Sequence, residues 1–408
     1  MTTDAPGGPR PALARCVSLD PGKFATAHWG RAPLLSHTGP FTDLLSPDAV
    51  DELLSRRGLR TPFLRVAQQG KVLPTARFTG AGGAGAEVAD QVIDEEVMRL
   101  YAGGATLVLQ GLHRIWPPLI HFTRRLGTEL NRPLQVNAYL TPPGSQGFDT
   151  HYDTHDVFVL QVDGVKRWRI HEPVLADPLE RQPWGGRADE VAATALGAPA
   201  MDVVLAPGDA LYLPRGWLHS AEAQEFRSLH LTIGVRALTR YALVEELLAM
   251  ATADARLRGT LPFGLDVTDP LAIEPELTET VEALRDWLAR ADPAEVADRL
   301  AARDWPAVRP APLSPLAQLD FAAGLTTSSL VAAREGLRWR LTDDGPDHVV
   351  LRLTGRTLRF PQSCGPALQL LLADGPMRVG DLPLDSDEDR LVLTRRLLRE
   401  AVLTPAPA

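Results

Sequence analysis

The chain has 408 residues, of which 45% are hydrophobic and 23% are charged, so it is long enough to bury the cores of two or three domains. Its formal net charge of −9 argues against nucleic-acid binding, which depends on Lys and Arg side chains that neutralise phosphates. The two cysteines are too few for a disulfide framework or a cysteine-based zinc site. No run of about 18 apolar residues occurs, so we expect no membrane span and a cytoplasmic protein.

The N-terminal part begins without apolar segments and then carries one clear helix signal. Residues 1–16 are rich in Pro, Gly and Thr, and we expect a disordered tail there. A helix is predicted at residues 46–57. Ser46 can cap its start, Pro47 suits its first turn, and Gly58 can end it.

A β-rich block follows and contains most of the predicted strands. Short apolar and β-branched runs recur between residues 105 and 230, separated by Pro and Gly, which indicates a barrel or sandwich. One predicted helix, at residues 117–130, interrupts the block. The predicted strands lie at residues 63–67, 106–109, 134–140, 157–162, 166–170, 203–205, 210–213 and 229–235. We assign residues 17–236 to one mainly β domain with some helix.

The C-terminal third changes character twice. Residues 237–320 have helical apolar patterns, with helices predicted at 239–257, 277–288 and 294–300. Helical domains of this size often bury one face against a second subunit, so we expect a homodimer. Residues 321–408 combine a predicted hairpin around Gly355 with two helices, at 365–373 and 386–400. This combination predicts a winged-helix-like domain.

A histidine and an aspartate two residues apart, His151 and Asp153, are the first candidate metal ligands. If this segment is a strand, residues two apart point to the same face, so the imidazole and the carboxylate project together. A second histidine from a distant strand would complete a set of two histidines and one carboxylate. Such a set leaves coordination positions open and is typical of non-haem Fe(II) oxygenases.

His219 is the predicted third ligand because of the pattern that leads to it. The segment from Gly208 to His219 is predicted to form a turn, a strand, a tight turn at Pro214 and Gly216, and the start of another strand. A His-x-Asp pair alone is common, but this longer pattern is rare. His155 is a competing ligand, and we expect it to support the site rather than to bind the metal.

Several segments of the β-rich block resemble the JmjC cupin proteins of the ribosomal oxygenase type. They are Val136–Pro143, His151–Phe158, Leu160–Trp168, Leu211–His219 and Ser228–Leu231. The resemblance covers roughly residues 20–240. It implies a double-stranded β-helix as the catalytic domain at 17–236. The later blocks are similar to that family's dimerisation domain (237–320) and C-terminal domain (321–408).

The resemblance also implies an activity and its site residues. It implies Fe(II), 2-oxoglutarate and O2, and hydroxylation of a side chain in a protein, such as a ribosomal protein, or in a peptide. Lys166 is expected to pair with the distal carboxylate of 2-oxoglutarate. Asn137, Tyr139 and Ser228 match positions that line the substrate pocket, and we expect Gln110 to reach it. Beyond the metal site, no side-chain acid or base is required.

Two other functions remain open. Demethylation of N-methyl-lysine would use the same iron chemistry, and mass spectrometry distinguishes the two because hydroxylation adds an oxygen whereas demethylation removes a methyl group. A non-catalytic cupin could instead act as a regulator or scaffold that binds DNA through the winged-helix-like domain. That domain carries many arginines but also many acidic residues, and the acidity of the chain argues against nucleic acid as a partner.

Overall fold

The computed structural model describes residues 10–373 and 375–406. The chain divides into two compact units. Unit 1 comprises Met1–Ala237, Pro310–Leu313 and Arg334–Gly336, and unit 2 comprises Leu238–Arg309, Ser314–Ala333 and Leu337–Ala408. The division of residues 237–408 into a helical domain and a winged-helix-like domain stays a prediction.

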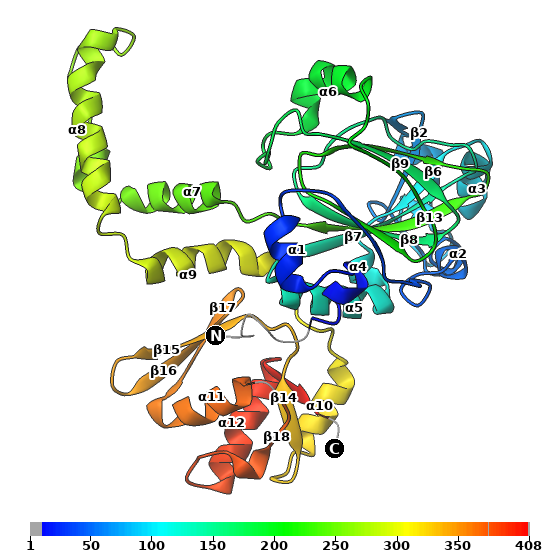
Figure 1. The fold of residues 1–408 in the computed structure, drawn as a ribbon. Coiled ribbons are helices and arrows are strands. Elements are labelled where there is room, and N and C mark those ends of the chain that lie inside the picture. Colours follow the sequence, from blue (N-terminus) through cyan, green and yellow to red (C-terminus); the bar gives the residue numbers. More distant parts are fainter. Residues whose placement is uncertain (1–9, 374, 407–408) are drawn as a thin grey trace. The chain divides into compact units, whose positions relative to one another are not determined.

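Two antiparallel sheets form unit 1 (Figure 1). The larger sheet has eight strands in the order β1-β11-β8-β13-β7-β6-β2-β3, and the smaller has three in the order β10-β9-β12. The larger sheet contains β1 (Leu34–His37), β2 (Leu64–Gln68), β3 (Lys71–Val72), β6 (Thr106–Leu109), β7 (Leu134–Thr141), β8 (Asp156–Asp163), β11 (Asp209–Leu213) and β13 (Ser228–Val235). The smaller contains β9 (Lys166–His171), β10 (Met201–Leu205) and β12 (Leu218–Ala223). A separate short pair consists of β4 (Thr79–Gly80) and β5 (Gln91–Val92).

The two faces of the larger sheet have different neighbours. Because successive strand residues alternate between faces, β8 turns Phe158 and Leu160 into the main hydrophobic core and Val157 and Val159 toward the smaller sheet. Side chains of both sheets line one cavity, so the sheets face each other across it. This arrangement confirms the predicted mainly β fold with helices and matches a double-stranded β-helix.

Helices cover the core face of the larger sheet. α5 (Pro117–Leu130) packs its apolar side chains into the main core, and α2 (Pro47–Arg56) is capped as predicted, with Ser46 Oγ accepting the Ala49 N–H at 3.1 Å. The pattern analysis did not identify α1 (Pro21–Ala27), α3 (Asp94–Ala102), α4 (Leu112–Ile115) and α6 (Ala188–Ala195). All four are short, with nine residues or fewer, which leaves little room for a helical period to show.

The N-terminal tail that we expected at residues 1–16 does not include residues 10–16. Residues 1–9 lie outside the described residues, but Leu13–Arg15 form a 3-10 turn, and Leu13 and Cys16 are buried. The Glu129 carboxylate accepts the backbone N–H groups of Ala12 and Leu13 at 2.9 and 2.7 Å. The prediction of disorder is therefore wrong for residues 10–16, because α5 provides an acceptor for two of their backbone N–H groups and the rest of the segment forms a turn on the core.

Unit 2 contains the remaining helices and two further three-stranded sheets. Its helices are α7 (Arg240–Ala251), α8 (Pro270–Leu288), α9 (Pro293–Asp304), α10 (Pro315–Ala323), α11 (Gly365–Leu372) and α12 (Asp387–Arg399). One sheet has the order β18-β14-β19, from Met377–Arg378, Leu330–Ala333 and Leu403–Pro405. The other has the order β15-β16-β17, from Trp339–Asp344, His348–Leu353 and Arg356–Pro361. A second hydrophobic core lies among the elements from α10 onward.

The helices α7, α8 and α9 contribute little to any core. Among their described residues, the buried apolar side chains are Ala242, Met250, Ala251 and Ala283. Larger apolar side chains on α7 and α8 are exposed, including Leu248, Leu271, Leu277 and Val281. Across the described residues, no helix has both the length and the apolar character needed to cross a membrane.

Candidate metal centre

His151 and His219 meet through their backbones. They form an isolated antiparallel bridge, with the His219 N–H donating to the His151 carbonyl at 2.8 Å and the His151 N–H donating to the His219 carbonyl at 3.2 Å. Their imidazole rings lie with centroids 4.5 Å apart. Two histidines from distant parts of the sequence are thereby placed side by side.

Each imidazole is oriented by a hydrogen bond to a nearby carbonyl. His151 Nδ1 lies 2.7 Å from the Asp149 carbonyl, and His219 Nδ1 lies 3.1 Å from the Trp217 carbonyl. A carbonyl oxygen can only accept, so each Nδ1 carries the proton and each Nε2 keeps its lone pair. This is the tautomer that a metal-binding histidine requires.

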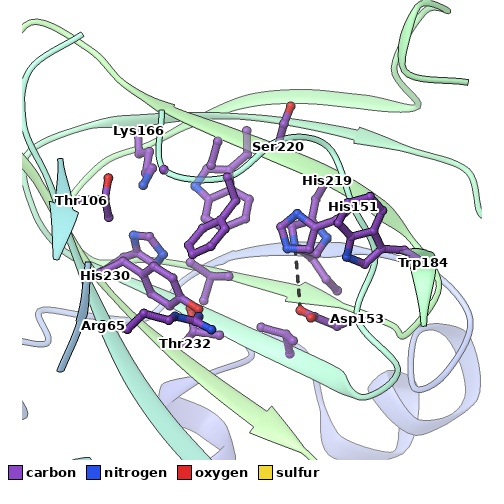
Figure 2. A pocket seen from close by; sticks show the side chains of 18 residues that line it. Arg65, Thr106, His151, Asp153, Lys166, Trp184, His219, Ser220, His230 and Thr232 are labelled. Carbon is purple, nitrogen blue, oxygen red and sulfur yellow. Dashed lines mark ion pairs between the residues drawn. The ribbon is translucent and has the colours of Figure 1, made fainter. Parts of the chain in front are cut away.

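Asp153 completes the cluster. One ligand atom from each of His151, Asp153 and His219 lies within 4.8 Å of the other two. Figure 2 shows the three side chains converging at one end of a pocket, with the Asp153 carboxylate 3.8 Å from His219 Nε2. Two nitrogen donors and one carboxylate oxygen fit a divalent transition metal and leave coordination positions for other ligands.

The protonation states suit metal binding. Burial, reinforced by the neighbouring His151, lowers the pKa of His219 to about 4, so its ring is neutral near pH 7. His219 Nε2 and the Asp153 carboxylate therefore approach each other as two unprotonated metal-binding atoms, not as an ion pair. Burial by itself would raise the pKa of Asp153, but the three neighbouring histidines and Arg65 outweigh it and lower that pKa.

The segment through His151 and Asp153 does not form a regular strand, although both residues reach the site. β8 begins only at Asp156, and His151 has bridge rather than strand structure. Asp153 is held instead by a backbone hydrogen bond, in which the Gly216 N–H donates to its carbonyl at 3.0 Å. The side chains converge because both residues pair with the segment around His219, not because they alternate along a strand.

His155, the competing ligand, lies outside the cluster. The group of described residues that could hold a metal ion consists of His151, Asp153 and His219. His155 Nε2 contacts Gln135 Nε2 at 3.3 Å. Its influence on the site is electrostatic, through the pKa of Asp153.

The metal cluster opens into a cavity of about 270 Å³ between the two sheets. Figure 2 shows the three candidate ligands at one end and Lys166 beside Thr106 at the other. Apolar side chains line the walls between the two ends; they are Val157, Val159, Trp168, Leu213 and Ala221. The cavity therefore has two polar ends with apolar side chains on the walls between them.

Lys166 is a buried cation that lacks an anionic partner. It is 3% exposed, and its ammonium donates to Thr141 Oγ1 at 2.9 Å. Within residues 10–373 and 375–406, no acidic side chain pairs with it. Burial lowers the pKa of Lys166 to about 7. A buried cation of this kind calls for an anion in the cavity.

Two further polar atoms in the cavity are unsatisfied. Trp168 Nε1 and His230 Nδ1 are buried and have no hydrogen-bond partner among the described residues. His230 stacks on Tyr139 with ring centroids 5.0 Å apart, and burial holds its pKa well below the usual value. Because buried polar groups are normally paired, these atoms indicate that a polar molecule completes the cavity. The donor set fits a small dianion with one carboxylate at Lys166 and the other at the metal.

Of the four predicted substrate-pocket residues, one lines the cavity and three do not. Tyr139 lines the cavity. Asn137, Ser228 and Gln110 are not among the described residues that line it. Asn137 Oδ1 accepts the Gly111 N–H at 3.2 Å, and the fully buried Ser228 Oγ accepts a hydrogen bond from Gln161 at 2.9 Å. The Gln110 N–H donates to the Phe63 carbonyl at 2.7 Å. A direct role for these three residues in substrate binding stays a prediction.

Other cavity residues were missed by sequence reasoning. Arg65, Phe148 and Trp184 line the cavity, with the Arg65 guanidinium carbon 5.2 Å from the centre of the Phe148 ring. Phe148 and Trp184 each lie just over 6 Å from His151, ring centre to ring centre. His230 also lines the cavity. Only Phe148 had a local signal, because it lies next to the His-x-Asp motif.

Removal of one imidazole tests the assignment of the metal ligands. We expect His219→Ala to lower Co(II) affinity by more than about 100-fold, since loss of even an outer partner of a ligand costs about 10–100-fold. His155→Ala is the matched control and should retain the affinity of the unaltered protein. Competition with a chromophoric chelator measures both. An equal loss in His155→Ala would place His155 among the ligands.

Parts of this sequence are similar to known proteins. Residues 120–243 match the family model of the JmjC domain. Human ribosomal oxygenase 1 is 29% identical over 445 residues, which cover 94% of this chain and 66% of the human protein. The Drosophila persimilis bifunctional lysine-specific demethylase and histidyl-hydroxylase NO66 is 31% identical over 262 residues, or 61% of this chain and 36% of that protein. The chain thus spans between about a third and two thirds of the length of these curated relatives.

Solved structures share the fold. Escherichia coli YcfD superimposes with a TM-score of 0.51 at 19% identity, covering 95% of this chain and 98% of YcfD. A second structure, of YcfD as a ribosomal oxygenase in complex with cobalt and 2-oxoglutarate, gives a TM-score of 0.50 at 20% identity. At this identity the likeness concerns the fold. Residues 120–243 are therefore similar to a JmjC domain, and the chain is similar in sequence to the ribosomal oxygenases.

Proposed function

We propose that this protein is an Fe(II)- and 2-oxoglutarate-dependent oxygenase that hydroxylates a side chain of a protein, such as a ribosomal protein, or of a peptide. One observation carries the proposal: the cluster of His151, Asp153 and His219 shares a cavity with a buried, anion-seeking Lys166. The relatives add support, since one is named a ribosomal oxygenase and the other a bifunctional lysine-specific demethylase and histidyl-hydroxylase.

The chain's own residues bind and orient the reactants. Iron held by the three ligands would couple oxidative decarboxylation of 2-oxoglutarate, which yields succinate and carbon dioxide, to insertion of one oxygen atom of O2 into a C–H bond. Lys166 would hold the carboxylate remote from the metal, and Trp168 Nε1 would donate to a cosubstrate oxygen. Val157, Val159 and Leu213 line the cavity with apolar surface, which keeps water from the reacting atoms.

The charges in the cavity favour hydroxylation over N-methyl-lysine demethylation. Asp153 is the only acidic side chain among the described residues that line the cavity, and the metal would neutralise it. Arg65 and Lys166 are basic, and Lys166 is matched by the cosubstrate. Arg65 lines the cavity and forms no ion pair with any described residue, so its positive charge would act on the target side chain. A methylated ammonium group would meet this like charge, whereas an uncharged side chain would not.

We also propose a homodimer in the cytoplasm. The exposed apolar side chains of α7 and α8, such as Leu248 and Val281, suit burial against a second copy. Both cysteines, Cys16 and Cys364, are free, which suits a reducing compartment. A light-scattering mass equal to that of one chain at micromolar concentration would contradict the dimer.

Reconstitution tests the proposed activity. Protein loaded anaerobically with Fe(II) should convert 2-oxoglutarate to succinate once O2 is admitted, and a candidate ribosomal protein or peptide should gain one oxygen by mass spectrometry. His151→Ala should abolish succinate formation because a ligand is lost. Absence of 2-oxoglutarate consumption by the wild-type protein with every candidate, or unchanged consumption by His151→Ala, would contradict the proposal.

The proposed Lys166 contact predicts a pH dependence. The pKa of Lys166 is lowered to about 7, so the ammonium form dominates below that pH and is lost above it. Binding a carboxylate above pH 7 then requires proton uptake, and the Kd for 2-oxoglutarate should rise by about tenfold per pH unit. Calorimetry on the Mn(II)-loaded protein without O2 measures it.

A charge-preserving variant is the control for this pH dependence. Lys166→Arg keeps a guanidinium that stays charged throughout this range, so its Kd should vary little with pH. Wild-type and Lys166→Arg profiles of the same slope would show that another group controls the pH dependence.

The role of Arg65 predicts a change in charge preference. Two like charges about 6 Å apart repel by about 3 kcal/mol at an effective dielectric constant of about 20. Arg65→Met should therefore strengthen binding of a trimethyl-lysine peptide to the Mn(II)·2-oxoglutarate complex by at least about tenfold after salt screening. Arg169→Met, which removes a charge from the outer face of β9, should leave this affinity unchanged. Equal affinities in the wild type and Arg65→Met would refute this role.

A further inference from the structure

Asp156 is a buried carboxylate at the first position of β8 to which the proposed chemistry gives no task. It is 3% exposed. Its Oδ1 accepts a hydrogen bond from the backbone N–H of Arg215 at 2.9 Å. Burial raises the pKa of this carboxyl group, and the Arg215 N–H and the Tyr212 side chain partly oppose that rise. Tyr212 is itself anchored, since its oxygen accepts the Gly30 N–H at 2.8 Å. The carboxylate thus joins the start of β8 to the turn that follows β11.

That turn, residues 214–217, holds two of the three candidate ligands. The Gly216 N–H donates to the Asp153 carbonyl at 3.0 Å. The Trp217 carbonyl accepts the hydrogen bond from His219 Nδ1 at 3.1 Å. A shift of the turn would therefore rotate the His219 ring and move the Asp153 backbone at the same time.

The opposite side of the turn is closely packed. Gly216 has a φ of +88°, and a Cβ added there would lie 2.8 Å from the Leu175 carbonyl oxygen and from Pro178 Cδ. The Arg215 guanidinium pairs with Asp177 at 2.8 Å. These contacts restrain the turn from outside, whereas the Asp156 carboxylate restrains it from the side of the sheet.

We propose that Asp156 is a positioning residue of the metal centre. By accepting the Arg215 N–H, it fixes the 214–217 turn so that His219 and Asp153 are held in the arrangement that binds the metal. The inference rests on the proposed metal site. It goes beyond that site by assigning a buried residue that does not coordinate the metal.

The test uses Co(II) as the probe on the full-length protein, with no substrate or turnover. Asp156→Ala removes the acceptor, and we expect the Kd for Co(II) to rise by about 10–100-fold, as for other outer partners of metal ligands. The visible d–d spectrum of the Co(II) complex should also change, because the His219 ring is no longer held. Asp156→Asn keeps an acceptor oxygen and should restore most of the affinity and the spectrum.

Val162→Ala is the matched control for simple loss of stability. It lies on the same strand, is buried in the main core, and does not line the cavity. It should lower the melting temperature yet leave the Co(II) Kd and spectrum unchanged. If Asp156→Ala does not fold, Asp156→Val takes its place, because a β-branched residue suits a strand but provides no acceptor.

The outcomes separate this inference from the proposed function. Weakened Co(II) binding with an altered spectrum in Asp156→Ala or Asp156→Val, restored in Asp156→Asn, supports the positioning role. An unchanged Kd and spectrum in a folded acceptor-free variant overturns it, as does a loss in Val162→Ala of the same size. If the wild-type protein itself does not bind Co(II), the proposed metal site fails and this inference fails with it.

Discussion

The metal centre depends on one pair of backbone hydrogen bonds, between His151 and His219. Those bonds join the segment after β7 to the beginning of β12, so that one ligand comes from each side of the two-sheet fold. The carbonyls of Asp149 and Trp217 then fix the tautomer and the orientation of the two rings. These hydrogen bonds fix the positions of the two rings, which limits the reorganisation that metal binding would require.

The second determinant of the cavity is its charge distribution. Burying an ammonium group without a counter-ion is costly, and the lowered pKa of Lys166 reflects that cost. In the proposed function, a dianion spanning the cavity relieves it by meeting Lys166 at one end and the metal at the other. In the same proposal, Arg65 adds a positive charge that forms no ion pair with any described residue, which would favour an uncharged target side chain over a cationic one.

The sequence predicted the site better than it predicted how the site is built. His151, Asp153 and His219 could be identified because their residue types and the Gly-Asp to Pro-x-Gly pattern are local features of the sequence. The segment through His151 forms no regular strand, and long-range pairing with His219, rather than local alternation, places the two side chains. Arg65 and Trp184 lie far from the motif, and no local pattern tells which residues of a distant strand or loop face a cavity.

Most strands of unit 1 were predicted because their apolar runs are bounded by Pro and Gly. The short helices such as α6 lacked a clear period.

A crystal structure with Mn(II) and 2-oxoglutarate tests the central claim most directly. The account predicts one anomalous scattering peak bound by His151 Nε2, an Asp153 carboxylate oxygen and His219 Nε2. It also predicts one end of 2-oxoglutarate at the metal and the distal carboxylate at Lys166. A metal bound elsewhere, or a cosubstrate whose distal carboxylate does not reach Lys166, would contradict it.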